Sequence, residues 1–318
     1  MPPPRQVERI KPPALRAGDT IGIVAPASYF KREDFEAGCV ALRQMGYNPV
    51  YEESIFDRDL YFAGSVDRRV REVENMFARD DVKAVICARG GYGSNYLLPG
   101  LDIAKINSHP KAFIGYSDNT TLQTYFCDAV GIVTFHGPMV AKDFAKPGGI
   151  DVESWHAALG GRENWRFDFD SNSGVKPLAT GSAEGVLYGG CLSMLVESLG
   201  TPYEIRTEGT ILFVEDINTK PYQIDRMLMH LKLAGKLKDV RGLIFGEMLD
   251  CVPAPNQGYT LEQVVMRIVG ELGIPVAYGL RSGHVSHQNI TLPIGVSVVL
   301  NVGGTGVTLE ILEPGTIL

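Results

Sequence analysis

The feature that most constrains the fold is an alternation of apolar runs and helical patterns in the first part of the chain. The run VKAVICAR at 82–89 is nearly continuous in apolar residues, which is typical of a parallel strand buried on both faces. In 65–80, Val66, Val70, Val73 and Phe77 recur at the spacing of one helix face. Strands that alternate with helices indicate parallel βα units with right-handed crossovers. The first part is therefore predicted to form a parallel sheet covered by helices.

The same patterns place the remaining elements. Strands are predicted at 19–28, 48–53, 111–116 and 131–135, and helices at 32–46, 94–107 and 118–129. In the second part, strands are predicted at 209–216 and 240–248, and helices at 221–237 and 261–273. The segment 184–200 reads as strand, turn and helix, and 289–312 as short strands joined by glycine turns. The second part is thus a mixture of strands and helices.

Between these parts, the segment 141–182 breaks the pattern. It is rich in Gly, Ser, Asp and Pro, which favour turns and irregular structure. We interpret it as a crossing between domains. The predicted organisation is an N-terminal domain at 1–142, a linker region at 143–182 and a C-terminal domain at 183–318.

Composition narrows the function classes. The net charge is −7 and no long block of Lys and Arg occurs, so neither nucleic acid nor an anionic membrane is an expected partner. The N-terminal MPPPRQVERIKPP has no apolar segment of the kind found in secretory signals, and no apolar stretch approaches membrane-spanning length. The five cysteines are scattered, without a CxxC pair, which favours free thiols in a reducing, cytoplasmic setting.

The sequence offers no support for a cofactor or a metal. The glycines of ARGGYGSN at 88–95 miss the spacing of a dinucleotide-binding loop, and no GxxxxGK[ST] motif occurs. His284 and His287 lie three residues apart, but no acidic cluster accompanies them and no HExxH motif exists. We therefore expect neither a nucleotide cofactor nor a metal site.

Ser117 is the first candidate for catalysis. It lies in FIGYSDN, on a corner between a predicted buried strand and a predicted helix. That context is typical of a nucleophile elbow, in which a tight turn lifts the hydroxyl out of the strand end and the following backbone N–H groups can hold an oxyanion. The motif lacks the full G-x-S-x-G pattern, so the alternative that Ser117 only caps the next helix stays open.

A serine nucleophile needs a histidine base, and the base needs an orienting carboxylate. Glu215 ends the apolar run TILFV, so it is predicted at the carboxyl end of a strand, where ligand sites in open sheets gather. A capping or ion-pairing role for Glu215 near the following helix is the alternative. Each histidine can equally be a surface or core residue, and the candidates are His109, His136, His156, His230, His284 and His287.

Cys191 gives a second possible nucleophile, because it follows the strand-like VLYGG and opens a helix. The alternative is a buried cysteine that only packs. A cysteine amide-transfer enzyme is accordingly one rival to a serine enzyme, and sensitivity to thiol-alkylating reagents separates the two. A non-catalytic binding protein for a small peptide or sugar is the second rival.

Several motifs in order along nearly the whole chain resemble the LD-carboxypeptidase family, the serine peptidases that trim cell-wall muropeptides and that include the microcin C immunity peptidases. These motifs are LRAGDTIGIVAPAS (15–28), RGGYG (89–93), FIGYSDNT (113–120), TFHGP (134–138), YGGCLSML (188–195), LFVEDINTKPYQIDRML (212–228) and SGHVSHQNITLPIG (282–295).

The resemblance implies a catalytic triad of Ser117, Glu215 and His284. It also implies an oxyanion hole from the backbone N–H groups of Asp118 and of a glycine in RGGYG, for which Gly91 is the candidate. Arg89 is a candidate, by position only, for gripping the terminal carboxylate of the substrate, and a structural arginine is the alternative. No metal or organic cofactor is implied.

The implied fold is α/β, with an N-terminal Rossmann-like or flavodoxin-like parallel-sheet domain that bears the serine. A C-terminal mixed α/β domain rich in strand supplies the glutamate and histidine, and the active site lies in the cleft between the domains. The implied activity is release of terminal D-alanine from muropeptide tetrapeptides by cleavage of an L-to-D amide bond, in murein recycling. Members are commonly homodimers.

One position departs from the family pattern, because relatives often carry asparagine where this chain has Cys191. The spacing of 98 residues between Ser117 and Glu215 (215 − 117) leaves little room for the long inserted substrate loop of microcin-type members. The expectation is therefore a muropeptide-trimming enzyme, with detoxification of a microcin C-type peptide antibiotic as the alternative.

Overall fold

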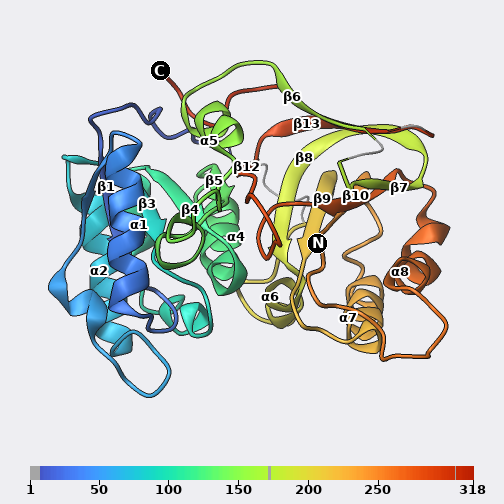
Figure 1. Cartoon of the computed structure of the whole chain (residues 1–318), viewed down its shortest axis with the longest axis horizontal. Coiled ribbons are helices and arrows are strands. Elements are labelled where there is room, and N and C mark those ends of the chain that lie inside the picture. Colours follow the sequence, from blue (N-terminus) through green and yellow to red (C-terminus); the bar gives the residue numbers. More distant parts are fainter. Residues whose placement is uncertain (1–7, 171–172, 305) are drawn as a thin grey trace.

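The computed structural model describes residues 8–170, 173–304 and 306–318. It has two β-sheets side by side, each flanked by helices (Figure 1). The first part of the chain builds the sheet on the left of Figure 1, and the second part builds the sheet on the right. The predicted α/β class, with a largely parallel N-terminal sheet and a strand-rich mixed C-terminal part, is confirmed.

The first sheet has six strands in the order β12-β5-β4-β3-β1-β2. Its strands are β1 (Thr20–Val24), β2 (Asn48–Val50), β3 (Val82–Cys87), β4 (Ala112–Gly115), β5 (Thr134–His136) and β12 (Leu292–Ile294). β1 to β5 are parallel in the flavodoxin-like order 2-1-3-4-5, whereas β12 joins antiparallel to β5. In such sheets ligands bind beyond the carboxyl ends of the strands, next to the point where the strand order reverses.

Helices cover both faces of this sheet. The helical segments are α1 (Arg32–Gln44), η1 (Glu53–Phe56), α2 (Val66–Ala78), η2 (Ser94–Leu97), α3 (Ile103–Ser108), η3 (Ser117–Asn119), α4 (Thr120–Ala129) and the π-helical turn η4 (Val140–Phe144). On β3, Ile86 packs in the apolar cluster that contains Phe35 of α1, whereas the preceding Val85 packs in the cluster that contains Phe77 of α2. The strand is therefore buried on both faces, as its apolar run predicts.

One predicted helix, at 94–107, is wrong as a single element. It consists of η2 and α3, which are separated by Pro99 and Gly100. Proline lacks the N–H that an uninterrupted helix needs and glycine is a poor helix former, so the chain turns between the two short segments.

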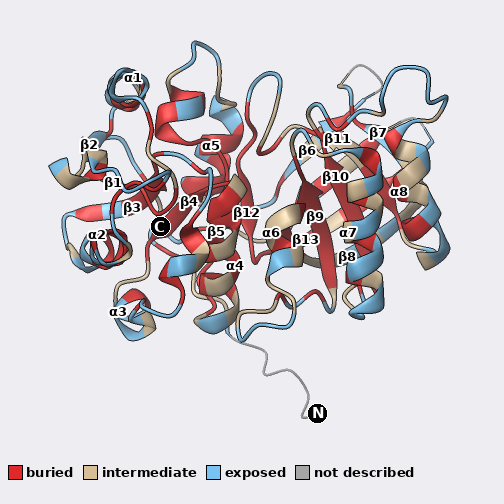
Figure 2. Cartoon of the chain, turned by 90° about the horizontal axis from the view of Figure 1, so that it is seen from below, coloured by how far each residue is buried: buried red, intermediate tan, exposed pale blue. Residues whose placement is uncertain are grey.

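The second sheet has eight strands in the order β6-β14-β13-β8-β9-β10-β11-β7. Its later strands are β8 (Gly181–Cys191), β9 (Thr210–Glu215), β10 (Gly242–Gly246), β11 (Val276–Leu280), β13 (Ser297–Val302) and β14 (Val307–Ile311). β8 to β11 are parallel, and the outer strands are antiparallel. Its helices are α6 (Leu192–Glu197), α7 (Pro221–Leu233), α8 (Leu261–Val269) and the turn η5 (Gly270–Leu272). Figure 2 shows the central strands of both sheets as the buried layers of the molecule.

The segment predicted as a linker contains regular structure. Helix α5 (Val152–Leu159) and strands β6 (Trp165–Phe169) and β7 (Lys176–Ala179) fall within it. β6 pairs with β14 and β7 pairs with β11, at opposite edges of the second sheet. The Gly- and Ser-rich composition reflects the turns around these edge strands, and the domain boundaries at 142 and 183 stay a prediction.

No helix in the described parts of the chain is long and apolar enough to cross a membrane. All five cysteines are free and buried.

Candidate active site

Ser117 sits on a strained corner directly after β4. Its φ is +63°, in the left-handed region that a residue with a Cβ rarely adopts. Such strain persists only where the surrounding structure enforces it, and it concentrates at functional sites. The preceding Tyr116 is almost completely buried, and α4 begins three residues after Ser117. This is the strand–turn–helix geometry of a nucleophile elbow, rather than the extended backbone that a helix-capping serine adopts.

A glycine loop after β3 lies against the serine. A Cβ on Gly90 would come within 2.7 Å of Ser117 Cβ and 3.0 Å of its Oγ, so only glycine fits there without displacing the serine. The neighbouring Gly91, predicted to donate to the oxyanion, has a φ of +110° and abuts Ser28. Gly90 therefore makes the close approach to Ser117, a role that the motif RGGYG alone does not assign.

Buried polar side chains fix this loop. The Arg69 side chain is fully buried, and its Nη1 donates to the carbonyl oxygens of Pro26 at 2.6 Å and Gly93 at 2.8 Å. The carboxylate of Asp118 accepts a hydrogen bond from Ser94 N at 2.7 Å. Burial raises the pKa of Asp118, although hydrogen bonds from Ser94 and Gly93 oppose that rise. The side chain of Asp118 thus ties the loop after β3 to the serine corner.

Glu215, on the second sheet, and His284, in the loop after β11, form a hydrogen-bonded pair. Glu215 is the last residue of β9, as its sequence position predicts, and is completely buried. Its Oε2 lies 2.8 Å from His284 Nδ1 and also accepts the backbone N–H of His284 at 3.0 Å. With Nδ1 donating to the carboxylate, Nε2 is the imidazole nitrogen left free to exchange a proton with another group.

The pair shifts the pKa of both groups. Burial alone raises the pKa of Glu215, but the charge and hydrogen bonds of His284, together with His136, outweigh it and hold the pKa well below its usual range. Burial lowers the pKa of His284, but the Glu215 carboxylate and its hydrogen bond outweigh that effect and raise the pKa above 6.5. Glu215 thus stays ionised, and it strengthens His284 as a base.

The two sheets meet at the serine corner. The rings of Tyr116 and His284 pack edge to face, with their centroids 5.1 Å apart. The backbone N–H of Cys191, at the end of β8, donates to Thr120 Oγ1 at 3.1 Å. The imidazole of His284, from the loop between β11 and β12, therefore contacts the residue directly before Ser117.

A second histidine approaches Glu215 from the first sheet. His136 ends β5 and is completely buried, and its Nε2 lies 3.8 Å from Glu215 Oε1. Its Nδ1 lies 2.9 Å from Ser282 Oγ. Sequence reasoning includes His136 only as one of six possible bases, although its place at the end of a predicted strand already puts it at the same sheet edge as Ser117.

The other candidates lie outside this cluster or are unsuited to it. Cys191 is buried, and burial together with nearby Glu215 and Asp216 raises the pKa of its thiol well above the ordinary value, which disfavours a nucleophilic thiolate. Arg89 is exposed and donates from Nη1 to the Tyr29 carbonyl oxygen at 3.0 Å. The remaining candidate histidines are His109, beside Ser108, the exposed His156 and His230, and the exposed His287.

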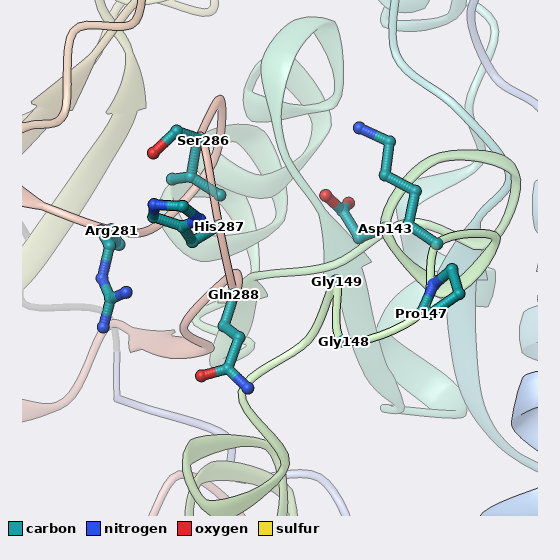
Figure 3. A pocket seen from close by; sticks show the side chains of 10 residues that line it. Asp143, Pro147, Gly148, Gly149, Arg281, Ser286, His287 and Gln288 are labelled. Carbon is teal, nitrogen blue, oxygen red and sulfur yellow. The ribbon is translucent and has the colours of Figure 1, made fainter.

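A cavity of about 390 Å³ lies beside the loop that carries His284 (Figure 3). Figure 3 shows Arg281, Ser286 and His287 on one wall and Asp143 and Pro147 on the other. Asp143 also links the cavity to the elbow, because its Oδ1 lies 3.4 Å from the Tyr116 hydroxyl. Within the described ranges, no group of three or more His, Cys, Asp or Glu residues is arranged to hold a metal ion.

Comparison with protein families gives two matches. Residues 21–137 match the LD-carboxypeptidase N-terminal domain, and residues 184–300 match the LD-carboxypeptidase C-terminal domain. The first range contains Ser117 and His136, and the second contains Glu215 and His284.

Individual relatives cover nearly the whole chain. A probable murein peptide carboxypeptidase of Bacillus subtilis is 39% identical over 304 residues, which are 94% of each chain. The microcin C7 self-immunity protein MccF of Escherichia coli is 29% identical over 328 residues, covering 93% of this chain and 94% of its own. The crystal structure of muramoyltetrapeptide carboxypeptidase from Oxalobacter formigenes has a TM-score of 0.82 and 30% identity, covering 93% of this chain and 99% of its own.

Proposed function

The chain belongs to the LD-carboxypeptidase family, and from that premise we propose that it is a serine carboxypeptidase that releases terminal D-alanine from muropeptide tetrapeptides. The observation that carries the proposal is the hydrogen bond between the buried Glu215 and His284, made next to the strained corner that holds Ser117. A nucleophile, a base and an orienting carboxylate are the three groups that this chemistry needs.

In the proposed mechanism, Ser117 Oγ attacks the carbonyl carbon of the L-to-D amide bond while His284 Nε2 takes the hydroxyl proton. Glu215 holds the imidazole in the required tautomer and stabilises the imidazolium that forms. His284 then gives the proton to the nitrogen of the departing D-alanine, and the C–N bond breaks. Water attacks the acyl-enzyme, its proton passes through His284 back to Ser117 Oγ, and the enzyme is regenerated.

The oxyanion needs backbone donors at the elbow. We propose the N–H groups of Asp118 and Gly91, each contributing about 10²–10³ in rate. The anchoring of the glycine loop by Arg69 and by the Asp118 carboxylate supports this assignment, because a preorganised donor has no reorganisation cost at the moment of reaction.

The substrate is expected to enter as a free peptide end, since an exopeptidase has to bind a terminal carboxylate. Arg89 is the proposed cation for that group, and its exposed position after β3 supports the assignment. The family likeness also leads us to propose a role in murein recycling in the cytoplasm. It further leads us to propose a homodimeric state, and light scattering of the purified protein tests that state directly.

Mass spectrometry of reactions with free muramoyl tetrapeptide tests the function, with wild type beside Ser117→Ala. We expect D-alanine release by the wild type only, with both proteins equally folded by circular dichroism. Equal release by both proteins would remove Ser117 from the mechanism. Release from a microcin C-type peptide, but not from the tetrapeptide, would favour the antibiotic-detoxifying alternative to which the resemblance to MccF points.

A further inference from the structure

Glu215 has two oxygens, and only one of them is engaged by His284. Both bonds from His284 go to Oε2, whereas Oε1 is buried and has no hydrogen-bond partner among the described residues. An ionised oxygen left alone in a dry interior is costly, so each such atom requires a physical explanation. Three glycines close the space around this carboxylate: a Cβ on Gly246 or Gly283 would collide with Glu215, and a Cβ on Gly190 would crowd His136.

The polar atom that faces Glu215 Oε1 is His136 Nε2. This nitrogen is also buried without a hydrogen-bond partner among the described residues, and it lies 3.8 Å from Glu215 Oε1. At that separation the contact is electrostatic rather than a hydrogen bond of ordinary length. The His136 ring is held by Phe213, with centroids 5.1 Å apart, and by Tyr116 at 6.0 Å. Each imidazole thus faces a different oxygen of one carboxylate.

Ser282 determines which way the proton on His136 points. Its Oγ lies 2.9 Å from His136 Nδ1 and donates to the His136 carbonyl oxygen at 3.3 Å. The hydroxyl can rotate to donate to Nδ1 instead, and the neutral ring then carries its proton on Nε2. In that arrangement an N–H points at Glu215 Oε1, which is what a buried carboxylate oxygen requires.

We propose that His136 is a positioning residue for the catalytic base. It rests on the proposed function, because it acts through Glu215 on His284. From β5 of the first sheet, His136 fixes the second oxygen of a carboxylate that belongs to the second sheet, and so keeps Oε2 aligned with His284 Nδ1. A carboxylate held at one oxygen only can rotate about its last bond, which would misalign the imidazole. His136 and Ser282 therefore connect the alignment of the base to the sheet that carries the nucleophile.

The groups around His136 define what a change there alters. Glu215 faces it from β9, Ser282 from the loop after β11, and Tyr116 from the elbow, with His284 on the far side of the carboxylate. Removing the donor at Nε2 should lower kcat with little change in KM, since the completely buried His136 is proposed to act through Glu215 and not on the substrate itself. In metal sites, residues that hydrogen-bond to a metal ligand and orient it are typically worth about 10–100-fold in affinity or activity, and we expect an effect of this size here.

The test compares wild type with His136→Phe, His136→Gln and Ser282→Ala, and uses His156→Gln as a control histidine on the surface. The readout is the rate at which a fluorophosphonate labels Ser117, followed by intact-protein mass, alongside kcat and KM on the tetrapeptide. Labelling needs an activated serine but not the correct peptide. A wild type that is labelled without hydrolysing the tetrapeptide therefore contradicts the proposed substrate, and leaves the role of His136 measurable.

We expect labelling about 10–100-fold slower in His136→Phe. His136→Gln should recover most of the rate, because its amide N–H can reach Oε1, and Ser282→Ala should lie between the two. His156→Gln should match wild type. A folded His136→Phe that is labelled at the wild-type rate would overturn the proposal. If His136→Phe does not fold, the proposal would be overturned by a Ser282→Ala variant whose labelling rate and pH profile equal those of the wild type. Absence of labelling in the wild-type protein would also overturn the proposal.

Discussion

Ser117 follows a strand of the first sheet and Glu215 ends a strand of the second, and different forces hold them. Ser117 is held by backbone fit: a left-handed corner, a buried tyrosine before it, and Gly90 pressed against its side chain. Glu215 is held by charge, through hydrogen bonds from His284 and the approach of His136. Changes at the Ser117 corner should therefore act through shape and be insensitive to pH, whereas changes around Glu215 should move the pH dependence of the reaction.

The largest effect on activity is expected from removing the charge of Glu215. Replacing Glu215 by Gln keeps the shape of the side chain but removes the charge that raises the pKa of His284 and fixes its tautomer. We expect kcat to fall by about 10⁴-fold. Steady-state kinetics on the tetrapeptide, with circular dichroism to confirm folding, measure this loss. A fall of less than tenfold would show that Glu215 does not orient the base.

At the Ser117 corner, which is held by backbone fit, the corresponding change is Gly90→Ala. The added methyl would meet Ser117 Cβ at 2.7 Å and displace the nucleophile. A misplacement of this kind can cost about 10²-fold in rate. Gly304→Ala is the control, because a Cβ there would meet nothing within 4 Å. Unchanged kcat in Gly90→Ala would mean that the Ser117 corner accommodates an added methyl group despite the close approach of Gly90.

The pH profile of the reaction most sharply separates the effect of shape at the Ser117 corner from the effect of charge around Glu215. Only neutral His284 can accept a proton, so activity rises with pH through the pKa of His284, which the Glu215 carboxylate raises above 6.5. The acid limb of kcat/KM should therefore lie at higher pH than for an ordinary histidine in wild type and in Gly90→Ala, and at lower pH in Glu215→Gln. An acid limb that stays in place in Glu215→Gln would assign it to another group.

The smallest effect is expected at Cys191. Its thiol is buried and its pKa is raised well above the ordinary value, so it serves packing rather than attack. Cys191→Ser should keep activity within about threefold, since the serine is small enough to fit and only buried polarity changes. Thiol-alkylating reagents should leave the native enzyme active. Complete loss of activity in the variant, or rapid inactivation by alkylation, would make Cys191 the nucleophile.

Local patterns predict the two site residues whose positions depend only on a short stretch of sequence. The corner at Ser117 follows from one apolar run meeting one helix, and Glu215 follows from the end of another run. Both are local signals, so they can be read without knowing which strands pair. By contrast, the choice of His284 among six histidines comes from the family resemblance, because no local pattern states which loop reaches Glu215.

Contacts over long distances in the sequence escape such reasoning. Strand β12 is only three residues long and pairs with β5, placing Leu292 opposite His136. Strands β6 and β7 lie in a segment whose glycines and serines suggest a linker, and pairing with β14 and β11 orders them. The approach of His136 to Glu215 has the same origin, because it arises only where the two sheets meet.

The most direct test of the account is to identify the residue that a fluorophosphonate modifies, in wild type and in His284→Ala. The account predicts one phosphonyl group, on the peptide that contains Ser117, formed at least 10³-fold more slowly when the base is absent. Modification of another residue, or an equal rate in the two proteins, would contradict the claim that the serine after β4 is activated by the histidine in the loop after β11.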